Sequence, residues 1–107
     1  MITATEDQAA AAFAALGNRT RLRLYRLLVR AGGDGLNVGD IQKLLDIPAS
    51  TLAHHLLTLT RAGLVIQHKQ GREVMSRADY DGIRAITNYL MNDCCKGVAF
   101  DRSETAA

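Results

Sequence analysis

Tryptophan is absent from this sequence, proline occurs once, and only two of its 107 residues are cysteines. No apolar run approaches the roughly 20 residues that a membrane-spanning helix requires, and the first residues lack the basic and then apolar pattern of a secretory signal. We therefore expect a cytoplasmic protein that makes no contact with a membrane. Thiols stay reduced in that compartment, so a structural disulfide is not expected.

Length and charge predict a single small domain with an uneven surface. A chain of this size, 48% hydrophobic, forms one domain (1–107) that is only marginally stable alone, and such domains often gain stability by forming oligomers. Residues 19–77 contain ten Lys or Arg against four Asp or Glu, whereas both flanking segments are acidic. A basic middle favours a polyanionic partner, although an ordinary solvated surface would have the same charge.

Two helices are predicted in the first third of the chain. Residues 6–16 are rich in alanine and are followed by Gly17, as is typical at a helix end. Asn18 can then cap a second helix, in which one face is apolar (Leu24, Leu27, Leu28, Ala31) and another is basic (Arg19, Arg23, Arg26, Arg30). The basic face could contact phosphate, but a solvated helix surface is the simpler interpretation.

The segment 38–62 has the pattern of a helix-turn-helix. A short helix with an apolar face (Val38, Ile41, Leu44, Leu45) precedes a turn, and Pro48 is placed to begin the next helix. In that next helix Leu52, Leu56 and Leu59 recur at helical spacing and predict a buried stripe. A different face is polar, contains no acid and is the predicted DNA-reading surface: Thr51, His54, Thr58 and Arg61.

A β-hairpin is predicted next, over about 64–77. Two short strands flank the turn "KQGR", where Gly71 permits the reversal of the chain. Lys69 and Arg72 lie at its tip. A hairpin that follows a recognition helix is typical of a wing, and a basic tip suits phosphates or a neighbouring minor groove.

The last predicted helix runs from about Tyr80 to Cys95. Ile83, Ile86, Leu90 and Cys94 form an apolar stripe along it, and Gly97 is placed to cap its end. The fold class is therefore mainly α with a small β-hairpin, a winged helix-turn-helix with the order α-α-α-α-β-β-α.

Three segments together resemble the ArsR/SmtB family of winged-helix repressors: "FAALGNRTRLRLYRLL" (13–28), "STLAHHLLTLTRAGLV" (50–65) and "KQGREV" (69–74). The resemblance covers nearly the whole chain. It implies a homodimer whose first and last helices (about 6–16 and 80–95) form the interface. The two recognition helices would read a palindromic double-stranded operator with half-sites about 34 Å apart. An effector would release the repressor from that operator.

The resemblance also implies roles for single residues. Ser50, Thr51 and His54 fall on positions at the exposed start of the recognition helix, where hydroxyls suit phosphates or base edges. We expect His54 to contact DNA and His55 to pack or hydrogen-bond within the motif. His68, on a strand of the wing, is expected to be an ordinary surface residue.

The effector sites of the family can be tested against this sequence. The thiol pair that arsenic-responsive members carry before the turn is absent, because Asn37 and Gly39 occupy that place. The zinc site of other members needs histidines on the last helix, and no histidine follows His68. The adjacent Cys94 and Cys95 remain, and they resemble the pair that some arsenical-responsive members carry near the end of the last helix.

Two thiols and no third cysteine predict a particular effector class. Soft thiolates suit soft ions, and trivalent arsenic prefers three ligands. A methylated arsenical such as methylarsenite leaves two positions to exchange, whereas arsenite leaves three. We expect a trivalent arsenical as effector and no required cofactor. Adjacent helical residues point about 100° apart, so capture by both thiols should distort the helix end and change the spacing of the recognition helices.

Other functions stay open at this stage. The thiols could respond to oxidants, or the dimer could join four thiols for antimonite, cadmium, lead or zinc. A core-packing role explains one cysteine well but two adjacent ones poorly. An enzyme is not expected, because the sequence has no Cys-x-x-Cys and no cofactor loop. A protein-interaction module is disfavoured by the basic middle.

Overall fold

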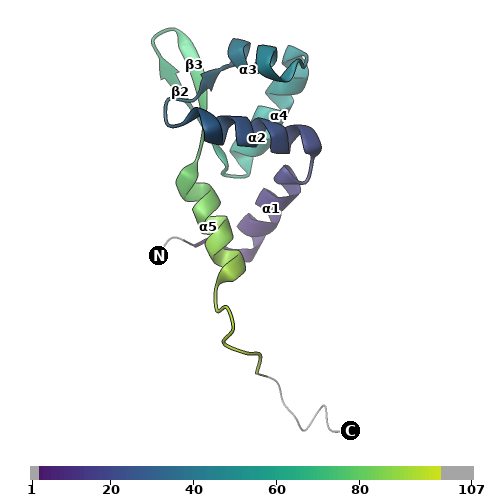
Figure 1. The fold of residues 1–107 in the computed structure, drawn as a ribbon, viewed down its shortest axis with the longest axis vertical. Helices are drawn as coiled ribbons and strands as arrows, with labels where there is room; N and C mark the ends of the chain where they lie inside the picture. Colours follow the sequence, from purple (N-terminus) through teal and green to yellow (C-terminus); the bar gives the residue numbers. More distant parts are fainter. Residues whose placement is uncertain (1–2, 100–107) are drawn as a thin grey trace.

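The computed structural model describes residues 3–99, so the predicted domain 1–107 extends beyond the described residues at both ends. Five helices and three strands follow one another in the order α1 (Glu6–Leu16), α2 (Arg19–Ala31), β1 (Leu36–Asn37), α3 (Val38–Leu45), α4 (Ala49–Arg61), β2 (Val65–Gln70), β3 (Glu73–Ala78) and α5 (Tyr80–Met91). The predicted winged helix-turn-helix is confirmed (Figure 1). Among the described residues no helix is long and apolar enough to cross a membrane.

Side-chain caps explain where the first helices begin. The Thr5 hydroxyl accepts a hydrogen bond from the Gln8 backbone N–H, and the Gln8 side chain accepts one from the Thr5 backbone N–H. This reciprocal pair satisfies two donors that the start of α1 would leave unpaired. The predicted cap at Asn18 is confirmed, because its Oδ1 accepts a hydrogen bond from the Arg21 N–H.

The wing is a three-stranded antiparallel sheet in the order β1-β3-β2. Gln70 and Glu73 pair at the end of the hairpin, with Gly71 and Arg72 between them. Strand β1 was not predicted, since two residues are too few to show an alternating pattern. It pairs Leu36 with Ser76 and so ties the start of the helix-turn-helix to the wing.

The core joins α2 and α4 beneath the wing. Both of the main predicted stripes are confirmed, because Leu24, Leu28, Leu52 and Leu59 are fully buried and Leu56 nearly so. Helix α3 contributes fully buried Ile41, but the inward orientation predicted for Val38 and Leu44 is wrong, since these side chains are 36% and 61% exposed.

Helix α5 ends four residues earlier than predicted. Its last residue is Met91, and Asn92 caps it with an extended backbone. The predicted continuation to Cys95 is therefore wrong, and so is the burial expected for Cys94, which is exposed. The predicted Gly97 cap is also wrong, because Gly97 lies beyond this end.

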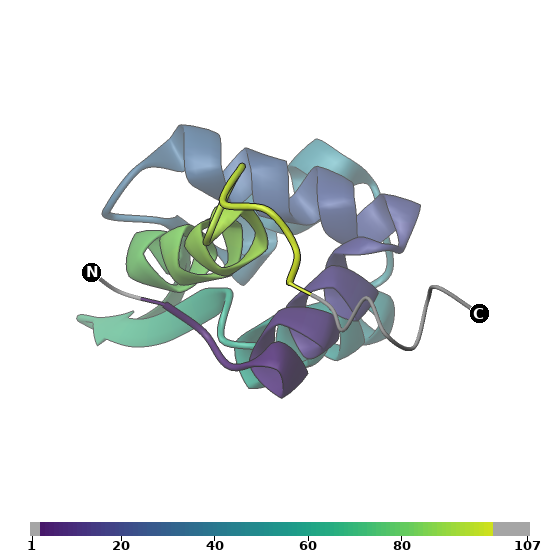
Figure 2. The same ribbon diagram turned by 90° about the horizontal axis from the view of Figure 1, so that it is seen from below.

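The elements are arranged so that α1 and α5 lie at one end of the molecule and the hairpin points to the other (Figure 1). Viewed from the α5 end, α2 lies along one side of the molecule (Figure 2). The buried face of α1 consists of alanines, and its Phe13 is 42% exposed. At the end of α5, Leu90 and Met91 are also exposed. Large apolar side chains thus meet solvent on both helices of this end.

Candidate nucleic-acid interface and thiol pair

The start of α4 presents its polar side chains to solvent. Ser50, Thr51 and His54 are all exposed, and they lie opposite the leucine stripe that holds the helix in the core. Residues at i, i+3 and i+7 share a helix face. These side chains therefore form a surface that is free of acidic groups and rich in hydrogen-bond donors.

The same face continues to the end of α4. Arg61 is exposed on the last turn, whereas Thr58 is partly buried. The Thr58 hydroxyl donates to the His54 backbone carbonyl at 3.1 Å. A hydroxyl bonded to its own helix keeps acceptor capacity but has used its one donor, so Thr58 differs from the freely exposed Ser50 and Thr51.

His55 is buried beside the recognition face, in agreement with the packing role expected for it. Its Nδ1 lies 3.4 Å from Nη1 of Arg21, and Nε of Arg21 donates to the Ala15 carbonyl at 2.6 Å. Burial, followed by the nearby Arg21 charge, lowers the pKa of His55 below its ordinary value. The neutral imidazole can therefore accept from Arg21. No periodic pattern in the sequence indicates this contact between α2 and α4.

The wing places its two predicted basic residues in slightly different settings. Arg72 lies in the turn itself, whereas Lys69 lies on β2 and pairs with Val74. Both are exposed. His68, expected at the surface, is only partly exposed, and its Nδ1 is buried without a partner among the described residues.

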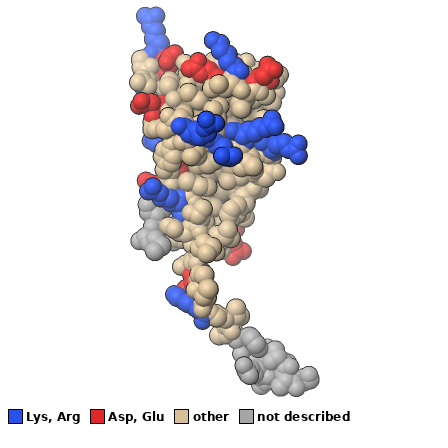
Figure 3. Space-filling view, in the orientation of Figure 1, with Lys and Arg blue, Asp and Glu red and all other residues tan. Residues whose placement is uncertain are grey.

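A second basic surface lies on α2, away from α4. Arg19, Arg23, Arg26 and Arg30 line a shallow hollow together with three leucines and no acid. Lys and Arg side chains gather across the middle of the face shown in Figure 3, at the height of α2. Leu24 and Leu28, on the other side of α2, face the core. This surface therefore lies on the side of α2 opposite its core-facing leucines.

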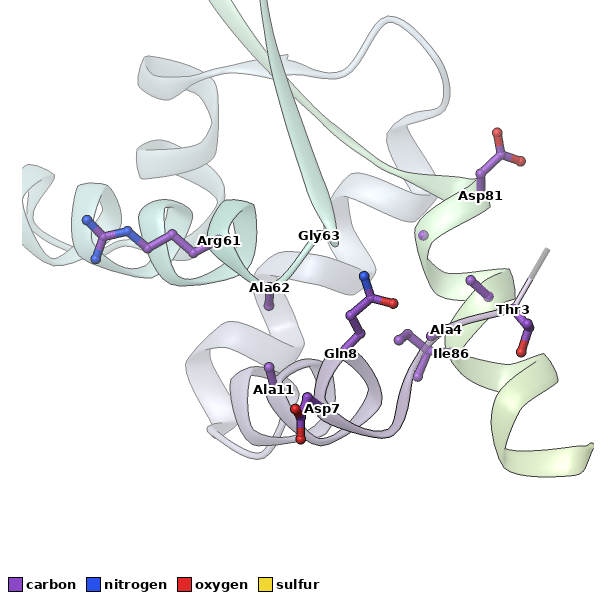
Figure 4. Close-up of a pocket in the computed structure, with 12 residues that line it drawn as sticks. Thr3, Ala4, Asp7, Gln8, Ala11, Arg61, Ala62, Gly63, Asp81 and Ile86 are labelled. Carbon is purple, nitrogen blue, oxygen red and sulfur yellow. The ribbon is translucent and has the colours of Figure 1, made fainter.

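A hollow of about 550 Å³ lies where α1, α5 and the end of α4 meet (Figure 4). Small side chains such as Ala4, Ala11 and Ala85 form much of its wall. In Figure 4 the Arg61 side chain extends along α4, away from Gln8 and Asp81. Arg61 thus borders this hollow, but its guanidinium group points away from α5.

Cys94 and Cys95 lie in a turn after α5, and their Sγ atoms are 3.1 Å apart. Their hydrogen bond raises the pKa of the Cys94 thiol above its ordinary value. Both thiols are exposed. The backbone of Cys95 is left-handed (φ 64°), a conformation that is uncommon outside glycine. The turn, rather than the helix, therefore brings the two sulfur atoms together.

An exposed ion pair spans this turn, with Lys96 Nζ 2.7 Å from Asp93 Oδ1. Pairs of this kind contribute about 0–1 kcal/mol, so it steadies the turn only weakly. Across residues 3–99, no group of three or more His, Cys, Asp or Glu side chains is placed to hold a metal ion. Among the described residues of one chain, Cys94 and Cys95 are thus the pair of side chains suited to bind a soft ion.

Comparison with known proteins places this arrangement in context. A family model described as a helix-turn-helix domain matches residues 16–68. A putative arsenical resistance operon repressor of Halobacterium salinarum is 41% identical over 58 residues, 54% of this chain and 44% of that protein. A cadmium resistance transcriptional regulatory protein of Listeria innocua is 37% identical over 62 residues, 58% of this chain and 50% of that protein. The chain thus spans about half the length of these curated relatives.

Two further matches cover more of the molecule. An uncharacterized HTH-type transcriptional regulator of Methanocaldococcus jannaschii is 38% identical over 65 residues, 61% of this chain and 71% of that protein. An ArsR-like transcriptional regulator from Rhodococcus superposes with a TM-score of 0.75 at 28% identity, covering 94% of this chain and 89% of that one. The chain belongs to the ArsR/SmtB family of winged helix-turn-helix transcriptional regulators.

Proposed function

We propose that the chain is an arsenical-responsive repressor. It binds a palindromic operator as a homodimer and is released when a trivalent arsenical bonds to Cys94 and Cys95. The observation that carries this proposal is the 3.1 Å separation of two exposed thiols in the turn after α5. Two ligands of one atom must be close neighbours, and these sulfur atoms already are.

The DNA-binding part of the proposal rests on the exposed face of α4 and on the wing. Ser50, Thr51 and His54 would reach base edges or phosphates at the start of the recognition helix. Arg61 and the two wing residues Lys69 and Arg72 would contact phosphates, and Thr58 would accept from a base or a water. Phosphate contacts fix register, whereas base contacts give sequence preference.

The two thiols also favour one class of arsenical. A monosubstituted arsenical RAs(OH)₂ exchanges its two hydroxyls for the two sulfurs: two As–S bonds form, two As–O bonds break, and the thiol protons leave with the hydroxyls as water. Arsenite would keep a third hydroxyl. Because soft thiolates select soft ions, methylarsenite is the complementary ligand of a two-thiol site.

Helix unwinding, expected from the sequence, is not needed for capture. The helix has already ended at Met91, and the turn holds the sulfurs together. Capture would instead lock this turn, which directly follows α5, one of the two helices expected to form the dimer interface. A ligand shifts DNA affinity only if it binds the free and the DNA-bound conformations differently.

The test is fluorescence anisotropy of the protein on duplex DNA from its own promoter. Methylarsenite, arsenite, zinc and hydrogen peroxide are titrated in separate runs. We expect release by methylarsenite at lower concentration than by arsenite. Cys94→Ser and Cys95→Ser should keep DNA affinity and lose release. Tight DNA binding that ignores every arsenical would contradict the effector assignment and leave the repressor role in place.

A redox-responsive repressor of the same fold is the second candidate, favoured by the same short distance. Hydrogen peroxide would take two electrons from the thiols, so that one S–S bond forms and two waters leave. Release by peroxide with no response to arsenicals would select it.

A further inference from the structure

A second hollow, which we call the α1–α4 hollow, lies between the first helix and the end of the recognition helix. Its volume is about 450 Å³. Helix α1 contributes small side chains, α4 contributes Thr58 and Arg61, the residue after α4 contributes Ala62, and α2 contributes Arg21. None of the lining residues is acidic. Two arginine side chains therefore border a small space whose lining has no carboxylate.

Arg21 is held in place at this hollow. Its Nε–H donates to the Ala15 carbonyl at 2.6 Å, and its Nη1 lies 3.4 Å from Nδ1 of His55. A guanidinium group has five N–H donors. These two contacts leave three N–H donors free. Because the guanidinium group is already held in place, it loses little further side-chain entropy when it binds an oxyanion.

Arg61 reaches the hollow from the other side. It is exposed on the last turn of α4 and forms no ion pair with any residue in the range 3–99. It shares a helix face with His54, seven residues earlier. Figure 4 shows its side chain directed away from α5. The hollow therefore opens beside the surface that we propose for reading the operator.

We propose that the α1–α4 hollow holds one backbone phosphate of the operator in each subunit, bound by Arg21 and Arg61. This inference rests on the proposed function, because it assigns a contact to the same recognition helix. Guanidinium groups bind phosphate oxygens through paired, charge-assisted hydrogen bonds. Alanines at positions 11, 14 and 15 leave room for the sugar-phosphate backbone to approach α1.

The contact would also have a structural consequence. Arg21 bonds to the end of α1 and to His55 of α4, so a phosphate on Arg21 would fix the recognition helix relative to α1. Phosphate contacts of this kind set register and orientation rather than sequence preference. Residue Arg21 thus acts as a positioning residue as well as a phosphate ligand.

The experiment replaces single operator phosphates by neutral methylphosphonates and measures affinity by anisotropy. Wild-type protein should lose roughly tenfold in affinity at one phosphate per half-site. Arg61→Gln should bind more weakly and be insensitive to the substitution at that same phosphate. Its slope of log affinity against log salt should be shallower by about 1.8, because each of two lost phosphates contributes about 0.9.

Two further variants control this result. Arg26→Gln removes an equivalent charge from the outward face of α2 and should leave the sensitive position and the salt slope unchanged. Arg21→Gln should behave like Arg61→Gln, provided that thermal unfolding shows the variant to be folded. Arg61 is exposed and has no hydrogen-bond or ion-pair partner among the described residues, so its variant tests the proposal even where Arg21→Gln unfolds.

The outcomes separate this inference from the proposed function. Tight DNA binding with an unchanged salt slope in Arg61→Gln, or equal methylphosphonate sensitivity in both proteins, would overturn the phosphate assignment alone. Absence of DNA binding by the wild type would overturn the proposed function first. Inorganic phosphate that shifts the Arg21 Nε–H resonance, without any sensitive position in the DNA, would assign the hollow to a free anion and also contradict the proposal.

Discussion

At the scale of single residues, the contact between Arg21 and His55 joins three helices. Arg21 belongs to α2. Its side chain donates a hydrogen bond to the Ala15 carbonyl at the end of α1 and contacts His55 on α4. The contact requires a neutral His55, because a protonated imidazole has no lone pair to accept the N–H and would repel the guanidinium. Burial and the Arg21 charge both keep the pKa of His55 low.

A pH dependence of stability follows. The unfolded chain takes up a proton on His55 near the ordinary value of 6.5, whereas the folded protein does so only at lower pH. The unfolded state therefore binds more protons just below pH 6.5, and the free energy of unfolding should fall as the pH drops through that range. Urea unfolding of the wild type and of His55→Gln between pH 5 and 8 measures this.

In His55→Gln the free energy of unfolding should fall less as the pH drops. The variant should also be less stable than the wild type at pH 7, because Arg21 loses its contact with His55 on α4. Thr51→Ala, an exposed change on the same helix that does not titrate, should follow the wild type at every pH. Parallel curves for His55→Gln and the wild type would show that another group causes the decline.

At the scale of elements, β1 is the part of the wing that depends most on close packing. Gly35 precedes it with φ 73°, and a Cβ atom there would overlap the carbonyl oxygen of Ser76 on β3. Only glycine combines this backbone conformation with so close an approach. The start of the helix-turn-helix is thus connected to the wing through a residue without a side chain.

Gly35→Ala should destabilise the protein by more than the roughly 1–2 kcal/mol that a left-handed backbone alone costs an L-residue. The overlap with β3 adds to that cost and should weaken the pairing of Leu36 with Ser76. Gly33→Ala is the matched control, since nothing lies within 4 Å of its Cβ position and its φ is not positive. Chemical unfolding and amide exchange of Ser76 would test both, and equal stability of the two variants would contradict the argument.

At the scale of the whole molecule, large apolar side chains are exposed on both helices of the α1–α5 end. Phe13 is 42% exposed, and Leu90 and Met91 are each 63% exposed. Contiguous exposed apolar side chains mark interaction sites. We propose this end as the surface where a second copy of the chain packs, as the family resemblance implies.

Leu90→Asp should therefore convert a dimer into a monomer, because a carboxylate buried without a partner opposes association. Operator affinity should fall by orders of magnitude, since one subunit reads only one half-site. Leu44→Asp, at a similarly exposed leucine on α3, should leave the oligomeric state unchanged. Sedimentation equilibrium decides this, and a Leu90→Asp protein that stays dimeric would place the interface elsewhere.

Much of the fold could be predicted because it depends on local spacing. The leucines of α2 and α4 recur at 3.6-residue intervals, Asn18 precedes a helix, and Gly71 lies between two strand-like runs, so these elements and the family were readable from the chain alone. The polar face of α4 followed from the same periodicity. Its role in DNA binding stays a prediction.

Tertiary structure decided the features in which residues distant in sequence meet or a local pattern is interrupted. The spacing of apolar residues predicted that the last helix continues through Cys94. In the structure α5 ends at Met91, and the thiols lie together in a turn where the backbone of Cys95 is left-handed. Strand β1 exists only because β3 pairs with it. Arg21 and His55, 34 residues apart, meet because α2 packs on α4. Spacing along the chain records which side of a helix a residue lies on, but not which other helix lies against that side.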